Sequence, residues 1–372
     1  MFNIKRRKSE LSKKFTFLFE KIIDEENLYQ SYKKVLLGQN KYTHDAIEFA
    51  RNETYNLKEL RDSLANKTYK HDGYYGFYVY EPKERLIYAP SFKDKVVQIA
   101  VNNILKKIYF NCFIYDSYGS IDNKGTHKCA ERISYFMRKA KWQYGDQAYI
   151  IKLDIKKFFY SIDREILKKL FRKKILCKDT LWLLDLIVDT AKQIDEKGLP
   201  LGNTLSQLSS NIYLNEVDQY VKHTLRIKYY VRYMDDMILI VENKEKAKQV
   251  LKEMEAFIKN NLNLELNKSK SKIFPIKQGV NTVGFKIFAT HRLLRSSSKK
   301  KIKRKVKAMP NLLNNKGTKL VKAEQILNSW LGHSKYASSY NFINSLIKKH
   351  DFLKLTDKGF KIDVEKLEGG SN

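Results

Sequence analysis

Two adjacent carboxylates lie between two runs of β-forming residues in the middle of the chain. Residues 228–232 (KYYVR) and 237–241 (MILIV) are rich in aromatic and branched side chains, and the sequence YMDD separates them. Two such runs joined by a short polar pair predict a β-hairpin with Asp235 and Asp236 at its tip. Neighbouring exposed aspartates repel each other unless a cation lies between them. The hairpin tip is therefore a candidate cation site.

A second apolar run upstream also ends in an acid. Residues 149–153 (YIIKL) predict a strand, and Asp154 follows it directly. Three carboxylates from two neighbouring strands are what phosphoryl transfer with two magnesium ions requires. The pattern predicts a template-directed polymerase.

The charge of the chain predicts nucleic acid as the partner. Lys and Arg number 72 against 41 Asp and Glu, a net charge of +31. A lysine-rich proteome would spread this surplus evenly, yet residues 292–307 hold nine basic residues and no acid. Such a block suits a polyanion, because each phosphate contact releases counterions. The 24 Tyr and 20 Phe offer rings on which bases can stack.

Other classes are disfavoured by what the sequence lacks. Its apolar runs are short and interrupted by Lys and Arg, so no membrane span or membrane partner is expected. No apolar signal-peptide core follows the basic start. Cys112, Cys129 and Cys177 are far apart and form no CxxC pair, which argues against structural zinc and a disulfide framework. We expect a cytoplasmic protein.

The order of predicted elements is α+β. Helical periodicity is expected at residues 10–66, 93–107, 126–140, 163–190, 206–226 and 243–261, and in a basic C-terminal tail. A hairpin is expected over residues 73–88 and a β region over 264–289. We see no internal repeat. The catalytic strands are expected to form one compact central subdomain.

Two segments near the acids are candidate nucleotide-binding elements. Phe159 follows Asp154 by five residues, and a ring there can press on the sugar and exclude a ribose 2′-OH; alone, an aromatic residue more often fills a core. Residues 198–207 (GLPLGNTLSQ) form a loop that opens a helix. Gly202 allows close approach of a nucleotide, and Ser206 or Gln207 can contact template or sugar. The alternative is an ordinary loop with a helix cap.

Basic residues on two further segments suit a triphosphate. Lys83 and Arg85 lie on the predicted upstream hairpin, where they can clamp phosphate oxygens. A surface hairpin also carries such residues without a role. Lys270 lies in a segment with several lysines, one of which can protonate the leaving pyrophosphate, and spacing alone does not select it.

These segments together resemble a reverse transcriptase. Residues 151–163 resemble the first palm motif of that family, 198–207 the second and 233–236 the third, while 283–285 (VGF) resemble the primer-grip turn. The resemblance spans about residues 70–350. It implies a right-hand polymerase with fingers, palm and helical thumb.

The same resemblance implies roles for individual residues and two Mg²⁺ ions. The catalytic residues and metal ligands would be Asp154, Asp235 and Asp236, with Ile155 also at the metals. The nucleotide-binding set would be Lys83, Arg85, Phe159, Gly202, Gln207 and Lys270. The nucleic-acid-binding set would be Gly284, Arg292, Arg295, Lys299, Lys303, Arg304 and Lys307.

The subdomain boundaries follow from the same interpretation. We expect a helical N-terminal extension at residues 1–66, fingers at 67–148, a palm at 149–289, and a basic helical thumb with its tail at 290–372. About 65 residues separate the primer-grip turn from His350. This leaves room for a thumb but not for an RNase H or endonuclease domain.

Within the family, the finer resemblance is to diversity-generating retroelement enzymes. Leu201 and Gln207 stand where group II intron enzymes usually have Gln and Pro, and residues 88–98, 290–298 and 329–333 look like segments of the former group. Lys95 departs from the commoner Arg. Such enzymes copy a non-coding template RNA into cDNA with errors at adenines, bound to a small basic accessory protein.

Alternative interpretations stay open. Retron and antiphage defence reverse transcriptases share the palm motifs, and one sequence does not separate diversification from defence. For Trp330 and His333, packing within the thumb is the favoured interpretation, and contact with RNA is the alternative. A non-catalytic RNA-binding scaffold is disfavoured by the intact acids, and an RNA-templated RNA polymerase by Phe159.

Overall fold

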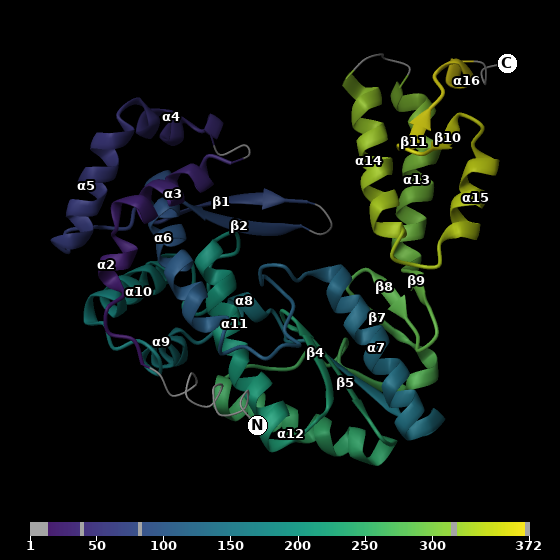
Figure 1. The fold of residues 1–372 in the computed structure, drawn as a ribbon, viewed down its shortest axis with the longest axis horizontal. Coiled ribbons are helices and arrows are strands. Elements are labelled where there is room, and N and C mark those ends of the chain that lie inside the picture. Colours follow the sequence, from purple (N-terminus) through teal and green to yellow (C-terminus); the bar gives the residue numbers. More distant parts are fainter. Residues whose placement is uncertain (1–13, 38–40, 81–83, 314–317, 369–372) are drawn as a thin grey trace.

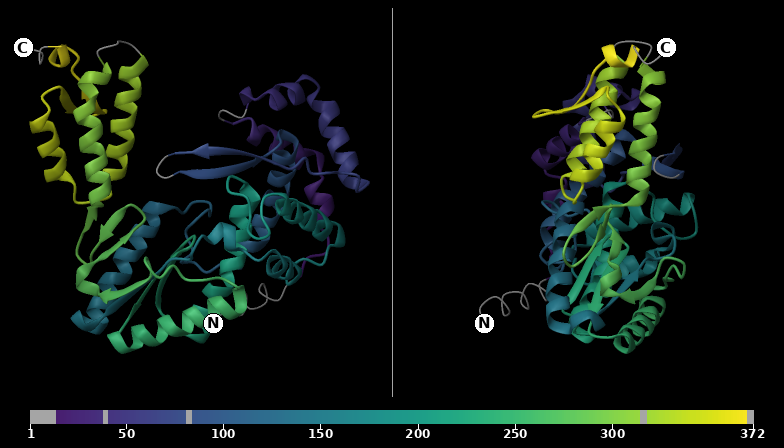
Figure 2. Two further views of the ribbon diagram at one scale, coloured as in Figure 1. Left: turned by 180° about the vertical axis from the view of Figure 1, so that it is seen from behind. Right: turned by 90° about the vertical axis from the view of Figure 1, so that its right-hand side faces the viewer.

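The computed structural model describes residues 14–37, 41–80, 84–313 and 318–368, which fold into three parts (Figure 1). Purple and blue N-terminal helices with a long hairpin form the fingers. Teal and green elements around a central sheet form the palm below them. The yellow-green C-terminal helices of the thumb stand opposite the hairpin, as the left view of Figure 2 also shows. The predicted α+β right-hand architecture is confirmed.

The fingers are built around one buried helix, α6 (Phe92–Tyr109). Ser91 begins this helix by accepting a hydrogen bond from the backbone N–H of Asp94 at 3.2 Å. The side-chain amide of Asn27 ties a neighbouring helix to α6 by donating to the carbonyl of Ala100 at 3.2 Å. The helices expected as the N-terminal extension pack against α6 or against one another: α2 (Phe19–Ile22), α3 (Glu25–Val35), α4 (His44–Arg51) and α5 (Glu53–Ala65). The antiparallel strands β1 (Tyr74–Val79) and β2 (Arg85–Pro90) form the fingers hairpin.

The palm contains a four-stranded sheet in the order β4-β5-β3-β6. All of its neighbouring strands are antiparallel. The strands are β3 (Tyr149–Leu153), β4 (Tyr229–Tyr233), β5 (Asp236–Val241) and β6 (Lys272–Pro275). Leu153 pairs with Met237, so Asp154 emerges at the end of the sheet where the β4–β5 turn lies.

Both faces of this sheet are covered, because its strands alternate apolar side chains between two cores. Ile151 and Leu153 face a core shared with α11 (Thr204–Gln219) and α12 (Lys244–Leu262). Ile150 faces the other core, which includes α7 (Thr126–Tyr144). Period-two burial on both faces fixes the register, since a slip of one residue would exchange the two sets.

A second, three-stranded sheet connects the palm to the thumb. It consists of β7 (Val280–Thr282), β8 (Phe285–Ile287) and β9 (Arg292–Leu294) in that order. The thumb continues with α13 (Ser296–Leu313), α14 (Thr318–Ser334), α15 (Tyr340–Lys349), the hairpin β10 (Leu353–Thr356) and β11 (Gly359–Ile362), and α16 (Glu365–Glu368). Its apolar core is separate from the two palm cores.

The structure differs from the sequence prediction in two places. Residues 163–190 form two helices, α9 (Arg164–Arg172) and α10 (Lys178–Thr190), because the chain turns where Phe15 pairs with Ile175. The hairpin β10–β11 was not predicted in the thumb. Short helical segments complete the path: Phe158–Ser161, Gly145–Gln147, Ala191–Gln193, Tyr220–Thr224 and Ile276–Gln278. None of the described helices is long and apolar enough to cross a membrane.

Candidate active site

The β4–β5 turn brings its two acids to the end of β3. Tyr233 pairs with Asp236, so Met234 and Asp235 alone form the turn. Met234 has φ +53°, in the left-handed region that tight hairpin turns require. The turn also packs closely against Gly119, where an added Cβ would lie 2.5 Å from Met234 Cγ. The predicted hairpin with acids at its tip is therefore present.

A fully buried ion pair supports the turn from below. Arg232 donates through Nη2 to Asp218 Oδ2 at 2.7 Å, and both side chains have no exposed surface. The same guanidinium donates to the carbonyl of Met234 at 3.2 Å and to Asn211 Oδ1 at 2.9 Å. Tyr230 donates its hydroxyl proton to Asp218 at 2.7 Å. Because buried charges are stable only when fully paired, this network fixes the backbone that carries Asp235.

Asp235 is the acid whose protonation the site perturbs most clearly. Burial is the main cause that raises the pKa of its carboxyl group to about 6. The negative charges of Asp154 and Asp236 act in the same direction on this pKa, while Lys270 opposes them. The three acids therefore lie within electrostatic reach of one another. A positive charge placed among them would relieve this repulsion.

Two lysines hold the other acids. Lys270 donates to both carboxylate oxygens of Asp154, at 3.0 and 2.8 Å, and this contact raises the pKa of the ammonium. Lys152 lies 3.5 Å from Asp236 Oδ1 and donates to the carbonyl of Asn281 at 2.8 Å. Lys270 is about half exposed and so has room to move, whereas Lys152 is largely buried.

The donor chemistry of the site fits a divalent cation. Carboxylate oxygens are the preferred ligands of magnesium, and the pKa of Asp235 is raised first by burial and further by the negative charges of Asp154 and Asp236. Among the described residues, however, no three acidic, His or Cys side chains are gathered closely enough to form a metal cluster. Asp154 is hydrogen-bonded to Lys270, and Asp236 lies beside Lys152. Ile155 lies beside Asp154, buried and bridged to Leu266.

The first motif contacts the glycine loop of the second motif through their backbones. Leu199 donates its N–H to the carbonyl of Phe159 at 2.7 Å. A Cβ at Gly198 would come within 2.6 Å of Tyr160 Cα, and the φ of Gly198 is +88°, so this position requires glycine. Phe159 is partly buried against the core. Its ring therefore has both an apolar support and an accessible side.

The same loop is joined to the fingers hairpin. Tyr88 of β2 donates its N–H to the carbonyl of Leu201 at 2.9 Å. A Cβ at Gly202 would lie 2.6 Å from Ile87 Cγ2, which explains the glycine here. Asn203 begins α11 by accepting from the N–H of Leu205 at 2.8 Å, as a cap does.

The remaining nucleotide-binding candidates have different exposure. Arg85 is exposed at the start of β2, and Gln207 is exposed in the first turns of α11. Ser206, the alternative to Gln207, is buried. Lys83 lies outside the described residues. Lys270 is the lysine of its segment that the structure brings to an acid.

The predicted nucleic-acid-binding residues divide into three groups. Gly284, with φ +91°, forms the tight turn against His333. Arg292 and Arg295 are partly buried rather than exposed. Lys299 and Lys303 lie over the ring of Phe342, at 5.6 and 5.4 Å from its centre, and Arg304 and Lys307 are exposed.

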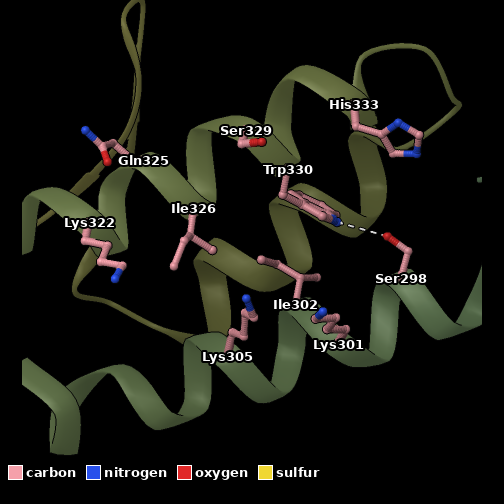
Figure 3. A pocket seen from close by; sticks show the side chains of 10 residues that line it. All are labelled: Ser298, Lys301, Ile302, Lys305, Lys322, Gln325, Ile326, Ser329, Trp330 and His333. Atoms are coloured by element: carbon pink, nitrogen blue, oxygen red, sulfur yellow. Dashed lines mark hydrogen bonds between the residues drawn. The ribbon is translucent and has the colours of Figure 1, made fainter. Parts of the chain in front are cut away.

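A basic groove lies between α13 and α14 (Figure 3). Its volume is about 560 Å³, and no acidic side chain lines it. Lys301 and Lys305 enter it from α13 and Lys322 from α14. Trp330 closes one end by donating from Nε1 to Ser298 Oγ at 3.2 Å. Trp330 thus packs between the helices, as the sequence analysis favoured.

The thumb joins the palm through stacked rings. His333 stacks on Phe285 with ring centres 4.4 Å apart, and His127 stacks on Tyr336 at 3.7 Å. Burial lowers the pKa of His333, and the nearby His127 lowers it further. His333 is therefore a structural contact between palm and thumb.

The sequence analysis missed two groups of residues at this site. Lys152 and Arg232 occupy ordinary strand positions, and only the folded chain brings them to Asn281 and Asp218. The groove lysines were missed because the basic block does not show which side of α13 faces α14. Period-two alternation could have flagged Lys152, which is two residues before Asp154 on the same face of β3.

Residues 70–287 match the family described as reverse transcriptase (RNA-dependent DNA polymerase). This match covers more than half of the chain and all three acids. The chain belongs to the reverse transcriptase family and, by class, is an RNA-directed DNA polymerase.

Three proteins from different organisms are similar to this chain at modest sequence identity. Protein YkfC of Escherichia coli is 26% identical over 275 residues, covering 62% of this chain and 70% of that protein. The group II intron-encoded protein LtrA of Lactococcus lactis is 23% identical over 409 residues, covering 90% and 65%. The putative COX1/OXI3 intron 2 protein of Saccharomyces cerevisiae is 23% identical over 261 residues, covering 53% and 30%. The chain thus spans less than two thirds of the latter two.

Solved structures of telomerase are also similar. Apo telomerase from Candida tropicalis has a TM-score of 0.47 and 14% identity, covering 65% of this chain and 53% of that one. Telomerase from Candida albicans in complex with a telomeric RNA fragment has a TM-score of 0.45 and 15% identity, covering 79% and 61%.

Proposed function

We propose that the protein copies a cognate non-coding template RNA into cDNA by two-magnesium phosphoryl transfer, as enzymes of diversity-generating retroelements do. The observation that carries the chemistry is the meeting of Asp154 and Asp235 at one end of the palm sheet, beside Lys270. The template RNA, dNTPs, cDNA product and a small basic accessory protein are the partners of this proposal.

In this mechanism the carboxylates of Asp154 and Asp235 would hold two magnesium ions, and Asp236 would assist. Magnesium bound there would lower the pKa of the primer 3′-hydroxyl and stabilise charge on the phosphoryl group and pyrophosphate. Lys270, which donates to Asp154, would lie close to the reacting phosphates and supply a proton to the departing pyrophosphate.

The nucleotide lies between the fingers and the glycine loop. Arg85 reaches the triphosphate from β2, and the guanidinium fork matches phosphate oxygens. Gly202 lines a pocket beside the fingers hairpin, where its backbone can approach the nucleotide. Phe159 contacts the sugar and excludes a ribose 2′-OH, which selects dNTPs.

The duplex of template and product continues toward the thumb. Among the described residues that line the groove, Lys301, Lys305 and Lys322 are basic and none is acidic, so the groove presents positive charge to the phosphates of this duplex. In the sequence, the turn at Gly284 lies between the three acids and the groove lysines. In this proposal the turn supports the 3′ end of the primer.

The retroelement type is proposed from the glycine loop. Leu201 replaces a residue that usually carries an amide in group II intron enzymes, and Gln207 replaces a proline at an exposed position of α11. Both changes alter the pocket that selects the incoming base. Looser base selection is the physical expectation.

Sequencing of DNA made in cells that carry the native locus, beside an Asp235→Asn control, tests this proposal. We expect products that match a nearby RNA, with substitutions concentrated at template adenines and absent from the control. Short repetitive or unrelated products that increase on phage infection would contradict diversification and support the antiphage alternative. Products identical in the control would support a non-catalytic scaffold.

A further inference from the structure

Aromatic and cationic side chains alternate along the solvent side of α7. We call these residues the outer ladder: Tyr115, Lys124, Arg132, Tyr135, Lys139 and Trp142. The cation-to-ring-centre distances are Lys124–Tyr115 4.9 Å, Arg132–Tyr115 5.3 Å, Arg132–Tyr135 5.4 Å, Lys139–Tyr135 5.9 Å and Lys139–Trp142 5.9 Å. Its four α7 members recur every three or four residues, so they share one face of the helix.

The rings of the outer ladder are not needed for packing. Tyr115 is 62% exposed, Tyr135 41% and Trp142 84%. The opposite side of α7 packs in the palm core through residues such as Ile133 and Met137. Three large aromatic side chains are therefore exposed along this strip, each with a cation over its ring.

The central cation of the ladder is held in place. Arg132 Nε donates to Asp116 Oδ1 at 2.7 Å, and its guanidinium lies 4.3 Å over the ring of Phe136. Lys124 donates to the carbonyls of Ser117, at 2.9 Å, and Tyr115. A hollow of about 530 Å³ lies between the loop before α7 and the helix; Tyr115, Lys124, Arg132 and Tyr135 line it together with the acids Asp122 and Glu131. The ladder is thus largely preformed.

The strip has a modest excess of positive charge. Helix α7 carries five Lys and Arg residues and a single acid, Glu131. Arg132 is paired with Asp116 and Lys141 with Asp146, and Asp122 lines the hollow beside Lys124. An ordered alternation of exposed rings and cations is the arrangement that binds unpaired nucleotides, with bases on the rings and phosphates at the cations. A protein or membrane surface does not require this alternation.

The strip is separate from the catalytic acids. It lies on the side of α7 away from the palm sheet, while the acids lie at the sheet's end. The N-terminal end of α7 meets the thumb at the His127–Tyr336 stack, and the helix then runs to the lower edge of the palm (Figure 1). RNA bound here would pass outside the polymerising site.

We propose that the outer ladder is a second RNA-binding site, which holds unpaired nucleotides of the RNA outside the active site. This inference rests on the proposed function, since an enzyme that copies one structured RNA must hold the part not being copied. The outer ladder would bind that part of the RNA by stacking its bases on the rings and pairing its phosphates with the cations, without base-specific contacts.

The test uses the full chain with its active site occupied by a dideoxy-terminated primer on an RNA template. A fluorescein-labelled oligouridine is the probe, and its binding is followed by anisotropy. We expect the variant Tyr115→Ala/Tyr135→Ala/Trp142→Ala to bind the probe at least about tenfold more weakly. The control Tyr42→Ala/Tyr55→Ala/Tyr340→Ala removes three equally exposed rings elsewhere and should change affinity less than about twofold. Equal affinity in parent and ladder variant would overturn the inference.

Two further measurements keep the inference separate from the proposed function. The ladder variant should extend a short primer–template hybrid at the parental rate, because no ladder residue lies in the active site. Inactivity of the parent protein would contradict the proposed function alone, since probe binding is measured without synthesis.

A crosslinking experiment on the unmodified protein tests the same inference without relying on the folding of a variant. A 4-thiouridine probe on the unmodified, active-site-occupied protein should form adducts within residues 115–142. Adducts confined to the thumb or the catalytic sheet would overturn the inference.

Discussion

The palm turn places its acids on a fixed backbone, whereas the thumb groove presents its lysines on an open surface. At the turn, Asp235 stands on a backbone fixed by the fully buried Arg232–Asp218 pair. In the groove, Lys301, Lys305 and Lys322 line an open surface without an acid. The palm thus holds one acid on a backbone fixed by a buried ion pair, while the thumb offers distributed positive charge.

This difference follows from the task of each region. Phosphoryl transfer depends on geometry, so a single displaced carboxylate abolishes it. Holding a duplex by its phosphates depends on the sum of many weak, screened contacts. Substitutions should therefore act in an all-or-none way in the palm and in a graded way in the thumb.

The largest effect is expected from Asp235→Asn. The amide keeps the shape of the side chain but loses the charge that holds a cation, so RNA-templated DNA synthesis should fall about 1,000-fold, or about 4 kcal/mol in the barrier. Primer extension measures the rate, and thermal unfolding checks that the fold remains. Loss of less than about tenfold would contradict the role of Asp235.

The next effect is on stability, from Arg232→Met. This change leaves Asp218 buried without its ion pair and should cost about 3–5 kcal/mol of unfolding free energy. The matched control is Lys173→Met, which breaks the exposed Lys173–Glu216 pair and should cost less than about 1 kcal/mol. Denaturant titration compares the two. If both substitutions reduced the unfolding free energy equally, the buried Arg232–Asp218 pair would contribute no more than the exposed Lys173–Glu216 pair. That result would contradict the support we assign to the turn.

A graded effect is expected in the thumb. The variant Lys301→Gln/Lys305→Gln/Lys322→Gln should bind a primer–template hybrid more weakly, and its salt dependence should become shallower by about 1 for each phosphate that no longer meets a lysine. Affinity measured over a series of salt concentrations gives that slope. Lys348→Gln/Lys349→Gln/Lys358→Gln removes three exposed lysines outside the groove as a control. An unchanged slope in the groove variant would contradict duplex binding there.

The smallest effect concerns pH at the palm–thumb junction. Because the pKa of His333 is lowered in the folded protein, unfolding binds a proton below the ordinary value of about 6.5. Stability from this group is therefore present above that pH and is lost as pH falls through it. His333→Phe keeps a ring against Phe285 and should reduce the fall in Tm between about pH 7.5 and 5.5. The nearby His127 contributes its own charge, so an identical fall in the variant would exclude His333 as the cause.

The sequence predicted the positions of the three acids in the fold because their signal is contiguous. Asp235 and Asp236 sit in a four-residue motif between two strands, and Asp154 directly ends a third strand. Local periodicity and turn chemistry determine such features, and the hairpin at residues 74–90 was found in the same way.

The partners of those acids could not be predicted, because their contacts are set by tertiary structure. Lys152 reaches Asn281 and Asp236 only after β3, β5 and β7 have assembled. In α13, the basic block is continuous, but the apolar side formed by Ile302 and Val306 decides which lysines line the groove. The β10–β11 hairpin was missed because each strand is only four residues long, too short for its alternation of apolar and polar residues to stand out.

The most direct test of the central claim is primer extension by the purified protein on an RNA template, with either dNTPs or NTPs. We predict a DNA product that requires the RNA template and divalent cation, with little use of NTPs, and increased NTP use by Phe159→Ala. Synthesis that is independent of the RNA template, or that prefers NTPs in the parent protein, would contradict this account.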